Sequence, residues 1–320
     1  MRFVPLLGYV ALSVAVFVRN GVPLADDRVI AWLVGGLLCT CVALRVDRWR
    51  RLLVDWLPLA AALTAYDVLR GTFGGHVPIH WRQQPWVDDH VFGVVPTVWL
   101  QQRLWDASHL HWWDYATVLT YLSYFLVTPV TLAVLWLRRP EIFRRFVILL
   151  VGLWFSALAF FTLTPSTPPW LAGGEGKIGP VTRLVGPVSA HLPFLDPSVL
   201  WERGVRLAND LAAFPSLHEA MTILLAVMLW PLAGRRWRVL LVLYPLAMAF
   251  SLVYTGEHYV VDLAGGGLLV AAVVAVERFV VRLRSTDGAE LAHLGSPGRA
   301  RALGTDDQPA VCAGAAHDWV

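Results

Sequence analysis

The sequence predicts an all-α protein that crosses a membrane about eight times. Hydrophobic residues make up 57% of the 320-residue chain and charged residues only 15%, and the mean hydropathy is +0.58. These values lie well outside the balance of ordinary soluble domains. Apolar windows long enough to cross a hydrocarbon core of about 30 Å recur along the chain, and arginines gather between them.

The expected membrane helices follow one another in eight apolar windows. They run from Phe3 to Val18, Val29 to Leu44, Leu52 to Leu69, Ala116 to Leu137, Phe146 to Thr164, Leu217 to Ala233, Val239 to Tyr254 and Val260 to Val281. Asp55, inside the third window, is expected to hydrogen-bond to a neighbouring helix rather than to relay protons. The run Gly265-Gly266-Gly267 follows no strand, so it indicates close helix packing rather than a phosphate cradle.

The windows divide the chain into three parts. Residues 1–50 hold two extra N-terminal membrane helices, and an uncleaved first helix is favoured over a signal peptide because no good cleavage site follows it. Residues 51–284 form the main membrane domain. Residues 285–320 are rich in Ala, Gly and Asp and lack periodicity, so they are expected to be a disordered cytoplasmic tail.

The arginines between the windows predict the orientation. Short cytoplasmic loops of membrane proteins are enriched in Lys and Arg. If the N-terminus is cytoplasmic, the short loops on that side hold arginine clusters at Arg45 to Arg51, Arg138 to Arg145 and Arg235 to Arg238. The opposite side receives fewer basic residues, most of them in two long loops. Both termini are therefore expected in the cytoplasm.

The two long outer loops run from Arg70 to Tyr115 and from Pro165 to Phe214, and loops of this length are usually functional or disordered. The first is rich in Trp, which favours helices lying at the membrane interface. It also holds histidines and aspartates, but their spacing fits no standard zinc pattern, so we expect no metal site. The net charge of +3 gives no sign of a nucleic-acid partner, and the three cysteines suggest no disulfide framework.

Ionisable residues next to two of the last windows are the candidate catalytic groups. They lie in the segments Phe214 to His218 and Tyr254 to Asp262, and each charge in such a place costs about 2.5 to 3.5 kcal/mol. His258 and Asp262 are four residues apart and share a helix face, so the carboxylate can orient the imidazole as a nucleophile. The alternatives are a structural hydrogen-bonded cluster and a metal or haem site, for which further ligands are not evident.

The other segment suggests a second catalytic group at a helix start. Ser216 is a good N-cap residue, and the exposed N–H groups of such a helix end favour an anion such as phosphate. One histidine that attacks, together with His218 to protonate the leaving oxygen, is the minimum set for phosphoryl transfer through a covalent intermediate.

These motifs resemble the type 2 phosphatidic acid phosphatase superfamily. Its second motif reads Pro-Ser-Gly-His, here Pro215-Ser216-Leu217-His218; its third reads Ser-Arg-x5-His-x3-Asp, here Ser251-Leu252, then His258 and Asp262. The Pro-Ser-Leu-His form, with Pro168-Pro169-Trp170 upstream, is most similar to the inositol phosphorylceramide synthase branch (inositolphosphotransferases) and its bacterial relatives. The resemblance covers roughly Leu52 to Val281 and implies a six-helix catalytic bundle in the main membrane domain.

Two departures from the family pattern concern the phosphate. Leu252 stands where the third motif has Arg, and Arg139-Pro140 has Leu132 where the Lys-x6-Arg-Pro first motif needs Lys. Other outer-side groups must therefore bind phosphate. We expect Arg183 and Arg206 first, then Lys177 and Arg203, with the neutral groups of Asn209, Ser216 and Ser251. A separate hypothesis is that a polyol headgroup is bound by Asp67, Arg70, Asp88 or Asp89.

The resemblance implies a lipid-modifying enzyme without metal or other cofactor. His258 would attack a lipid phosphorus, Asp262 would orient it, and His218 would protonate the departing alcohol. The substrate would be a phospholipid or polyprenyl phosphate of the outer leaflet, in a bacterial plasma membrane. A polar phospho-headgroup such as phosphoinositol would pass to an alcohol acceptor. The alternatives are a lipid phosphatase, with water as acceptor, and a transporter or flippase.

Overall fold

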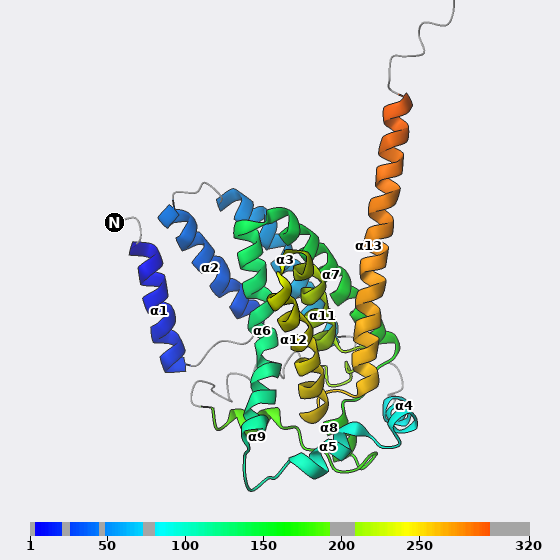
Figure 1. The fold of residues 1–320 in the computed structure, drawn as a ribbon. Helices are drawn as coiled ribbons and strands as arrows, with labels where there is room; N and C mark the ends of the chain where they lie inside the picture. Colours follow the sequence, from blue (N-terminus) through cyan, green and yellow to red (C-terminus); the bar gives the residue numbers. More distant parts are fainter. Residues whose placement is uncertain (1–3, 21–25, 45–48, 73–80, 193–208, 295–320) are drawn as a thin grey trace, which may run out of the picture. The chain divides into compact units, whose positions relative to one another are not determined.

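The computed structural model describes residues 4–20, 26–44, 49–72, 81–192 and 209–294, and these residues form helices joined by turns and loops, without a β-strand (Figure 1). The all-α prediction is therefore confirmed. Within the described ranges, every expected window coincides with a helix. The helices at these windows are α1 (Val4–Asn20), α2 (Asp26–Leu44), α3 (Trp49–Thr72), α6 (Trp112–Arg138), α7 (Pro140–Leu163), α11 (Leu217–Leu229), α12 (Arg235–Tyr254) and α13 (Val260–Leu294).

The number of membrane-spanning helices is lower than the predicted eight when length and composition are applied strictly. Within the described residues, five helices are long and apolar enough to cross a membrane, namely α3, α6, α7, α12 and α13. Shorter apolar helical segments occupy the other three windows, at Val4–Val16, Ala31–Val42 and Leu217–Leu232. The chain is thus a polytopic membrane protein, and the count of eight is not confirmed.

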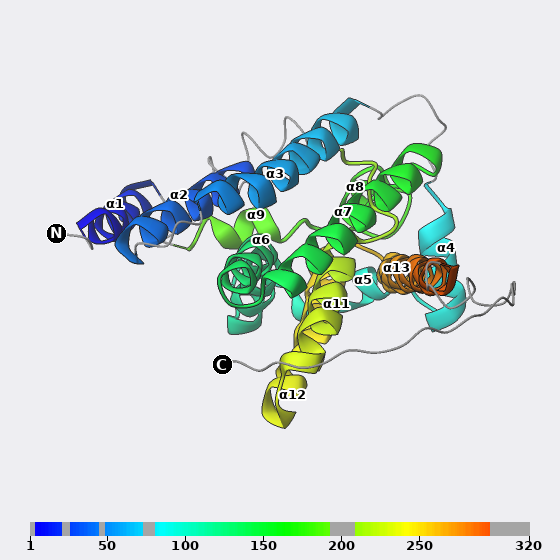
Figure 2. The same cartoon turned by 90° about the horizontal axis from the view of Figure 1, so that it is seen from above.

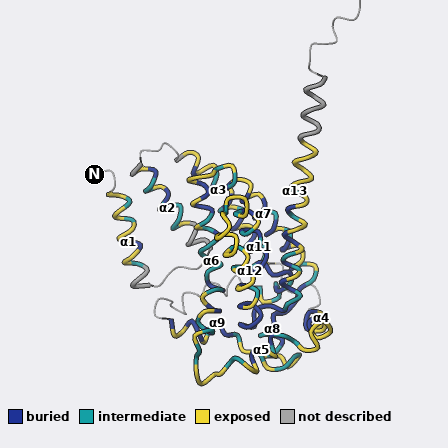
Figure 3. The backbone as a smooth tube through the Cα atoms, in the orientation of Figure 1, coloured by how far each residue is buried: buried dark blue, intermediate teal, exposed yellow. Residues whose placement is uncertain are grey.

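Helix α7 forms the centre of the hydrophobic core. It packs against α3, α6 and α11, and Figure 2 shows it between α3 and α11. Its inward residues Phe146, Leu153 and Ala157 are completely buried. Asp55 of α3 accepts a hydrogen bond of 2.9 Å from the indole N–H of Trp136 on α6, so the predicted interhelical bond is present. Outward-facing leucines, valines and phenylalanines stay exposed along these helices, as suits a surface that meets lipid (Figure 3).

Short helices fill the two long loops at one end of the bundle. They are α4 (Gln83–Phe92) and α5 (Pro96–Leu104) in the first loop, and α8 (Pro169–Gly174) and α9 (Val185–Ser189) in the second. Figure 1 shows α5, α8 and α9 near the lower ends of α6 and α12, and α4 beside the lower end of α13. The Trp-rich first loop is therefore helical in part, as its composition predicts.

Helix α13 belongs to two parts of the chain. Its residues up to Val274 are part of the compact unit that contains the rest of the described fold, whereas Ala275 begins a separate unit. The helix continues to Leu294, ten residues into the expected tail. Residues 295–320, the remainder of that tail, lie outside the described residues.

Two glycines let α13 approach the second motif. A Cβ atom at Gly265 would lie 2.5 Å from the ring of Phe214, and one at Gly266 would lie 2.5 Å from the carbonyl oxygen of Ser216. Carbon atoms cannot approach so closely, so larger residues at these positions would push α13 away from residues 214–216. The prediction that this glycine run serves helix packing is confirmed.

Candidate active site

The third motif lies on a tight turn between α12 and α13. The carbonyl of Leu252 accepts the N–H groups of Glu257 and His258, at 3.0 and 3.1 Å. Gly256 in this turn has a φ of +83°, and a Cβ atom there would lie 2.9 Å from the side chain of Val181. Only glycine meets both requirements easily. The turn therefore fixes where His258 leaves the end of α12.

A buried carboxylate from α4 holds the first turn of α13. Asp88 is 1% exposed, and its two oxygens accept the N–H groups of Val260 and Val261 at 2.9 and 3.0 Å. Helix N-termini favour such anionic partners. Burial raises the pKa of Asp88 to about 6, although these two hydrogen bonds act in the opposite direction. This side chain, weighed above as a headgroup ligand, instead caps the helix that carries Asp262.

The imidazole of His258 lies between a carboxylate and a second imidazole. Its Nδ1 is 3.4 Å from Oδ2 of Asp262, and its Nε2 is 3.4 Å from Nδ1 of His218. The same Asp262 oxygen accepts the N–H of Tyr259 at 2.9 Å. Asp262 is completely buried and His258 is 6% exposed. This geometry suits a neutral His258 with its proton on Nδ1 and a lone pair on Nε2, the form of a nitrogen nucleophile.

The second motif is joined to the third by the backbone. The N–H of Ser216 donates to the carbonyl of Asp262 at 3.0 Å. The Ser216 hydroxyl caps α11 by accepting the N–H of Glu219 at 3.3 Å, and it is completely buried. His218, in the first turn of α11, is thereby placed beside His258. The predicted N-cap role of Ser216 is confirmed, but its side chain is not among those that line the cavity described below.

The Pro-rich turn before α8 supports both motifs. Ser166 donates its N–H to the carbonyl of Leu211 at 2.8 Å, and its hydroxyl accepts the N–H of Phe214 at 2.8 Å. Trp170 donates its N–H to the carbonyl of Gly256 at 3.0 Å. The turn therefore ties the segment before α11 to the segment before α13.

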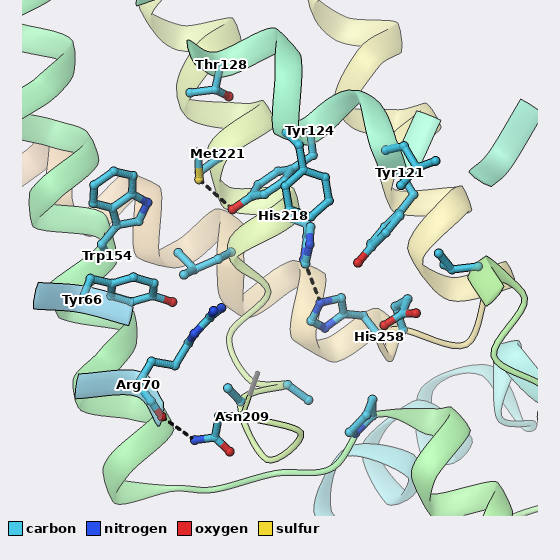
Figure 4. A pocket seen from close by; sticks show the side chains of 18 of the residues that line it. Tyr66, Arg70, Tyr121, Tyr124, Thr128, Trp154, Asn209, His218, Met221 and His258 are labelled. Atoms are coloured by element: carbon cyan, nitrogen blue, oxygen red, sulfur yellow. Dashed lines mark hydrogen bonds between the residues drawn. The ribbon is translucent and has the colours of Figure 1, made fainter. Parts of the chain in front are cut away.

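A cavity of about 500 Å³ opens beside the two histidines. His218 and His258 line it together with residues of α3, α6, α7 and α11 (Figure 4). The walls away from the histidines are mainly apolar and include Leu59, Leu63, Leu132, Leu150, Trp154 and Met221. Such a space fits an apolar chain that carries a polar group at the histidine end.

Arg183 contributes a positive charge to this cavity. Its Nε and one terminal nitrogen donate to the two carboxylate oxygens of Glu257, at 2.7 and 3.1 Å, and its guanidinium lies 4.7 Å from the ring centre of Trp170. Because Glu257 precedes His258, this pair brings the guanidinium close to the proposed nucleophile. A bidentate arginine–carboxylate pair is among the stronger charge-assisted interactions.

A glutamine of α5 fixes the segment that carries Arg183. The side chain of Gln101 accepts the N–H of Thr182 at 2.8 Å and donates to the carbonyls of Thr182 and Tyr254, both at 2.8 Å. It therefore links residue 182 to the last residue of α12.

The end of α3 brings further polar groups to the cavity. Arg70 lines it and forms an ion pair with Asp67, at 3.3 Å. Asn209 also lines the cavity, and its amide nitrogen donates to the backbone carbonyl of Arg70 at 3.2 Å. In Figure 4 the side chain of Arg70 is directed into the cavity, toward the histidines.

Other expected phosphate or headgroup ligands lie elsewhere. Ser251 is buried, and its hydroxyl donates to the carbonyl of Ala247 at 2.7 Å. Asp89 is exposed on α4, and Lys177 lies 5.8 Å from the ring centre of Trp81. None of these three expected ligands lines the described cavity. Arg203 and Arg206 lie outside the described residues.

Two tyrosines of α6 belong to the site although sequence reasoning missed them. The ring centres of Tyr121 and Tyr124 lie 5.1 and 4.4 Å from that of His218. The hydroxyl of Tyr124 donates to the sulfur of Met221 at 3.1 Å. Their spacing of three residues puts both tyrosines on one helix face, which was the available signal in the sequence.

The comparison with protein families agrees with these motifs. A family model described as the PAP2 superfamily matches residues 87–276, which include the second half of α4, both motifs and the first half of α13. No curated protein and no solved structure matches the chain. The family model covers more than half of the sequence, so the chain belongs to the PAP2 superfamily.

Proposed function

We propose that this membrane protein transfers a phospho-headgroup, such as phosphoinositol, from a phospholipid to an alcohol acceptor through a phosphohistidine intermediate. Membership of the PAP2 superfamily supports an enzyme of the lipid phosphatase or phosphotransferase type. The observation that carries the proposal is the contact of Asp262 with His258 and of His258 with His218, where both histidines line an apolar-walled cavity. The chemistry needs no metal, because positioning and fixed donors can stabilise the transition state.

The first step forms a P–N bond and breaks a P–O bond. Nε2 of His258 attacks the phosphorus, and Asp262 balances the positive charge that develops on the imidazole. The departing lipid alkoxide takes a proton from His218. In the second step His218 removes a proton from the acceptor alcohol, whose oxygen attacks the phosphorus and releases His258.

Substrate binding has to separate the two imidazoles. Nε2 of His258 and Nδ1 of His218 are 3.4 Å apart, so no phosphorus atom fits between them in this geometry. A phosphoryl group bonded to Nε2 needs that side of the ring. The His218 side chain, framed by Tyr121 and Tyr124, must therefore move relative to His258 when the lipid binds.

The same proposal places the site on the extracytoplasmic side and both termini in the cytoplasm. The cavity is lined near the end of α3 by Arg70 and at the start of α11 by His218. The arginine-rich turns from Arg138 to Arg145 and from Arg235 to Arg238 join the opposite ends of the same bundle. The positive-inside rule assigns those turns to the cytoplasm.

The test uses the purified full-length chain in lipid vesicles that contain a headgroup-labelled phospholipid. We expect release of diglyceride, and transfer of the label to an added alcohol such as inositol or a polyprenol. His258→Ala should lower turnover more than about 10³-fold because the nucleophile is lost. His90→Ala changes an exposed histidine of α4 and should leave turnover unchanged.

The outcomes separate the alternatives. Free labelled headgroup phosphate with no alcohol product would identify a phosphatase. Movement of labelled lipid between leaflets without cleavage would identify a transporter. Unchanged turnover in His258→Ala would contradict the proposed mechanism.

A further inference from the structure

Because the third-motif arginine of the family is absent, the cavity needs a positive charge from elsewhere to bind a phosphate. Leu252, which replaces it, is completely buried in the last turn of α12 and does not line the cavity. A phosphate that reacts at His258 carries at least one negative charge, and fixed cations are the usual means to stabilise it in phosphoryl transfer. The chain must therefore supply cations from other segments.

Arg183 meets only part of this requirement. Two of its nitrogens donate to Glu257 in a bidentate pair, so a full negative charge already lies against its guanidinium. Within the described residues, the other cation that lines the cavity is Arg70 of α3. Arg70, Arg183 and His218 all line this cavity.

The position of Arg70 suits a phosphate ligand. Its side chain is 31% exposed and points toward the histidines in Figure 4. It forms an ion pair with Asp67 at 3.3 Å, between neighbours on one helix, a geometry that contributes little when partly exposed. Its guanidinium also lies 5.4 Å from the ring centre of Tyr66, which orients the side chain along the cavity wall.

We propose that Arg70 is a phosphate-binding residue, and that it forms with Arg183 a two-arginine clamp on the phosphate group of the lipid. This inference rests on the proposed function and replaces the hypothesis that Arg70 reads a polyol headgroup. Arg70 lies on α3, which precedes the matched segment 87–276, so one of the two arginines comes from a helix that the family model does not include. Helix α3 thereby becomes part of the active site.

The decisive variant is Arg70→Met in the full-length chain. Methionine keeps an unbranched apolar stem beside Tyr66, and the bond from Asn209 is retained because it uses the backbone carbonyl of residue 70. We expect kcat/KM for the labelled phospholipid to fall about 10- to 100-fold. The inhibition constant of inorganic phosphate should rise at least about 10-fold. Arg70→Lys should bring both kcat/KM and the inhibition constant part of the way back to the wild-type values.

A matched control is Arg103→Met. Arg103 is exposed on α5 and its guanidinium lies 4.2 Å from the ring centre of Trp99, so it is also an arginine over an aromatic ring, but it does not line the cavity. In this variant, kcat/KM for the labelled phospholipid and the inhibition constant of inorganic phosphate should both stay within about twofold of the wild type.

Two results would overturn the clamp. One is an inhibition constant for inorganic phosphate that stays within twofold in Arg70→Met. The other is a fall in kcat/KM in Arg70→Met that occurs with lipids that carry an inositol headgroup but not with phosphatidic acid. That result would show that Arg70 binds a polyol headgroup. Wild-type protein without any phospholipid turnover would instead contradict the proposed function itself, so the two failures are distinguishable.

Discussion

The two sides of the cavity are held in place by different kinds of contact. We define the histidine wall as residues 214–219 and 256–262, and backbone groups fix it. Ser216 donates its N–H to the carbonyl of Asp262, and the carboxylate of Asp88 accepts two N–H groups from the first turn of α13. We define the α3 wall as the cavity-lining residues of α3, namely Leu59, Leu63, Tyr66 and Arg70.

The α3 wall meets the rest of the site mainly through its side chains. Tyr66 stacks on Trp154 of α7 with ring centres 6.0 Å apart, and Leu59 and Leu63 are buried in the core. The family model includes the histidine wall but not the α3 wall. Backbone geometry therefore fixes the two histidines proposed to react, whereas the wall proposed to contact the lipid can change by replacement of its side chains.

Among the residues that support His258, we expect the greatest loss of activity from a change at Asp262. In Asp262→Asn the amide oxygen can keep the contacts that Oδ2 makes with Tyr259 and His258, but it carries no charge to balance the imidazolium that forms during attack. We expect kcat to fall about 10²-fold or more, measured by diglyceride release. Asp106→Asn, at an exposed aspartate before α6, is the control. A loss below about fivefold in Asp262→Asn would show that the carboxylate does not assist the attack.

A smaller effect is expected when the support behind the histidine wall is changed. Asp88→Asn leaves one acceptor oxygen for two N–H donors and turns an amide N–H2 toward the other, which costs about 1 to 3 kcal/mol. Because α13 carries Asp262, we expect kcat to fall about 10-fold and the Tm to decrease. Unchanged kcat together with a lower Tm would limit Asp88 to folding and remove it from the positioning of the site.

The pH dependence of the Tm tests the raised pKa of the buried Asp88 carboxyl. Burial raises its pKa to about 6, from a usual value near 4, and repulsion from Asp262 acts in the same direction. Between these values the folded protein binds the proton more tightly than the unfolded chain, so the stability contribution of this group falls as pH rises from about 4 to about 6. Asp88→Asn lacks this titration. The wild-type Tm should therefore exceed the variant Tm by more at pH 4.5 than at pH 7.

The sequence predicted the helices and the contact of His258 with Asp262 because both depend on local patterns. Apolar windows define membrane helices by their length and composition. The four-residue spacing of His258 and Asp262 correctly predicts their contact, but His258 lies in the turn before α13, which begins at Val260, and not on a helix face as expected. The N-cap role of Ser216 is equally local, since it depends on the residues that follow it.

The supporting contacts escaped prediction because the residues that form them are distant in sequence. Asp88 meets Val260 across 172 positions, and Asn209 meets Arg70 across 139. No spacing rule connects such pairs. The same holds for Gln101, whose three hydrogen bonds set the position of Thr182 and hence of Arg183. Asn209 and Asp88 were expected as ligands of the substrate, but nothing in the sequence indicated the backbone groups that they bind.

The least change in activity is expected from a substitution in the apolar part of the α3 wall. Leu63 is buried and lines the apolar part of the cavity, so Leu63→Phe should fill space that the proposed lipid chain needs. We expect kcat/KM for a long-chain phospholipid to fall about fivefold, while that for a short-chain phospholipid stays within twofold. Leu57→Phe, on the same helix but 65% exposed, should change neither value. Equal losses for both chain lengths would mean that the substitution disturbs the histidine wall, and the two walls would then not be separable.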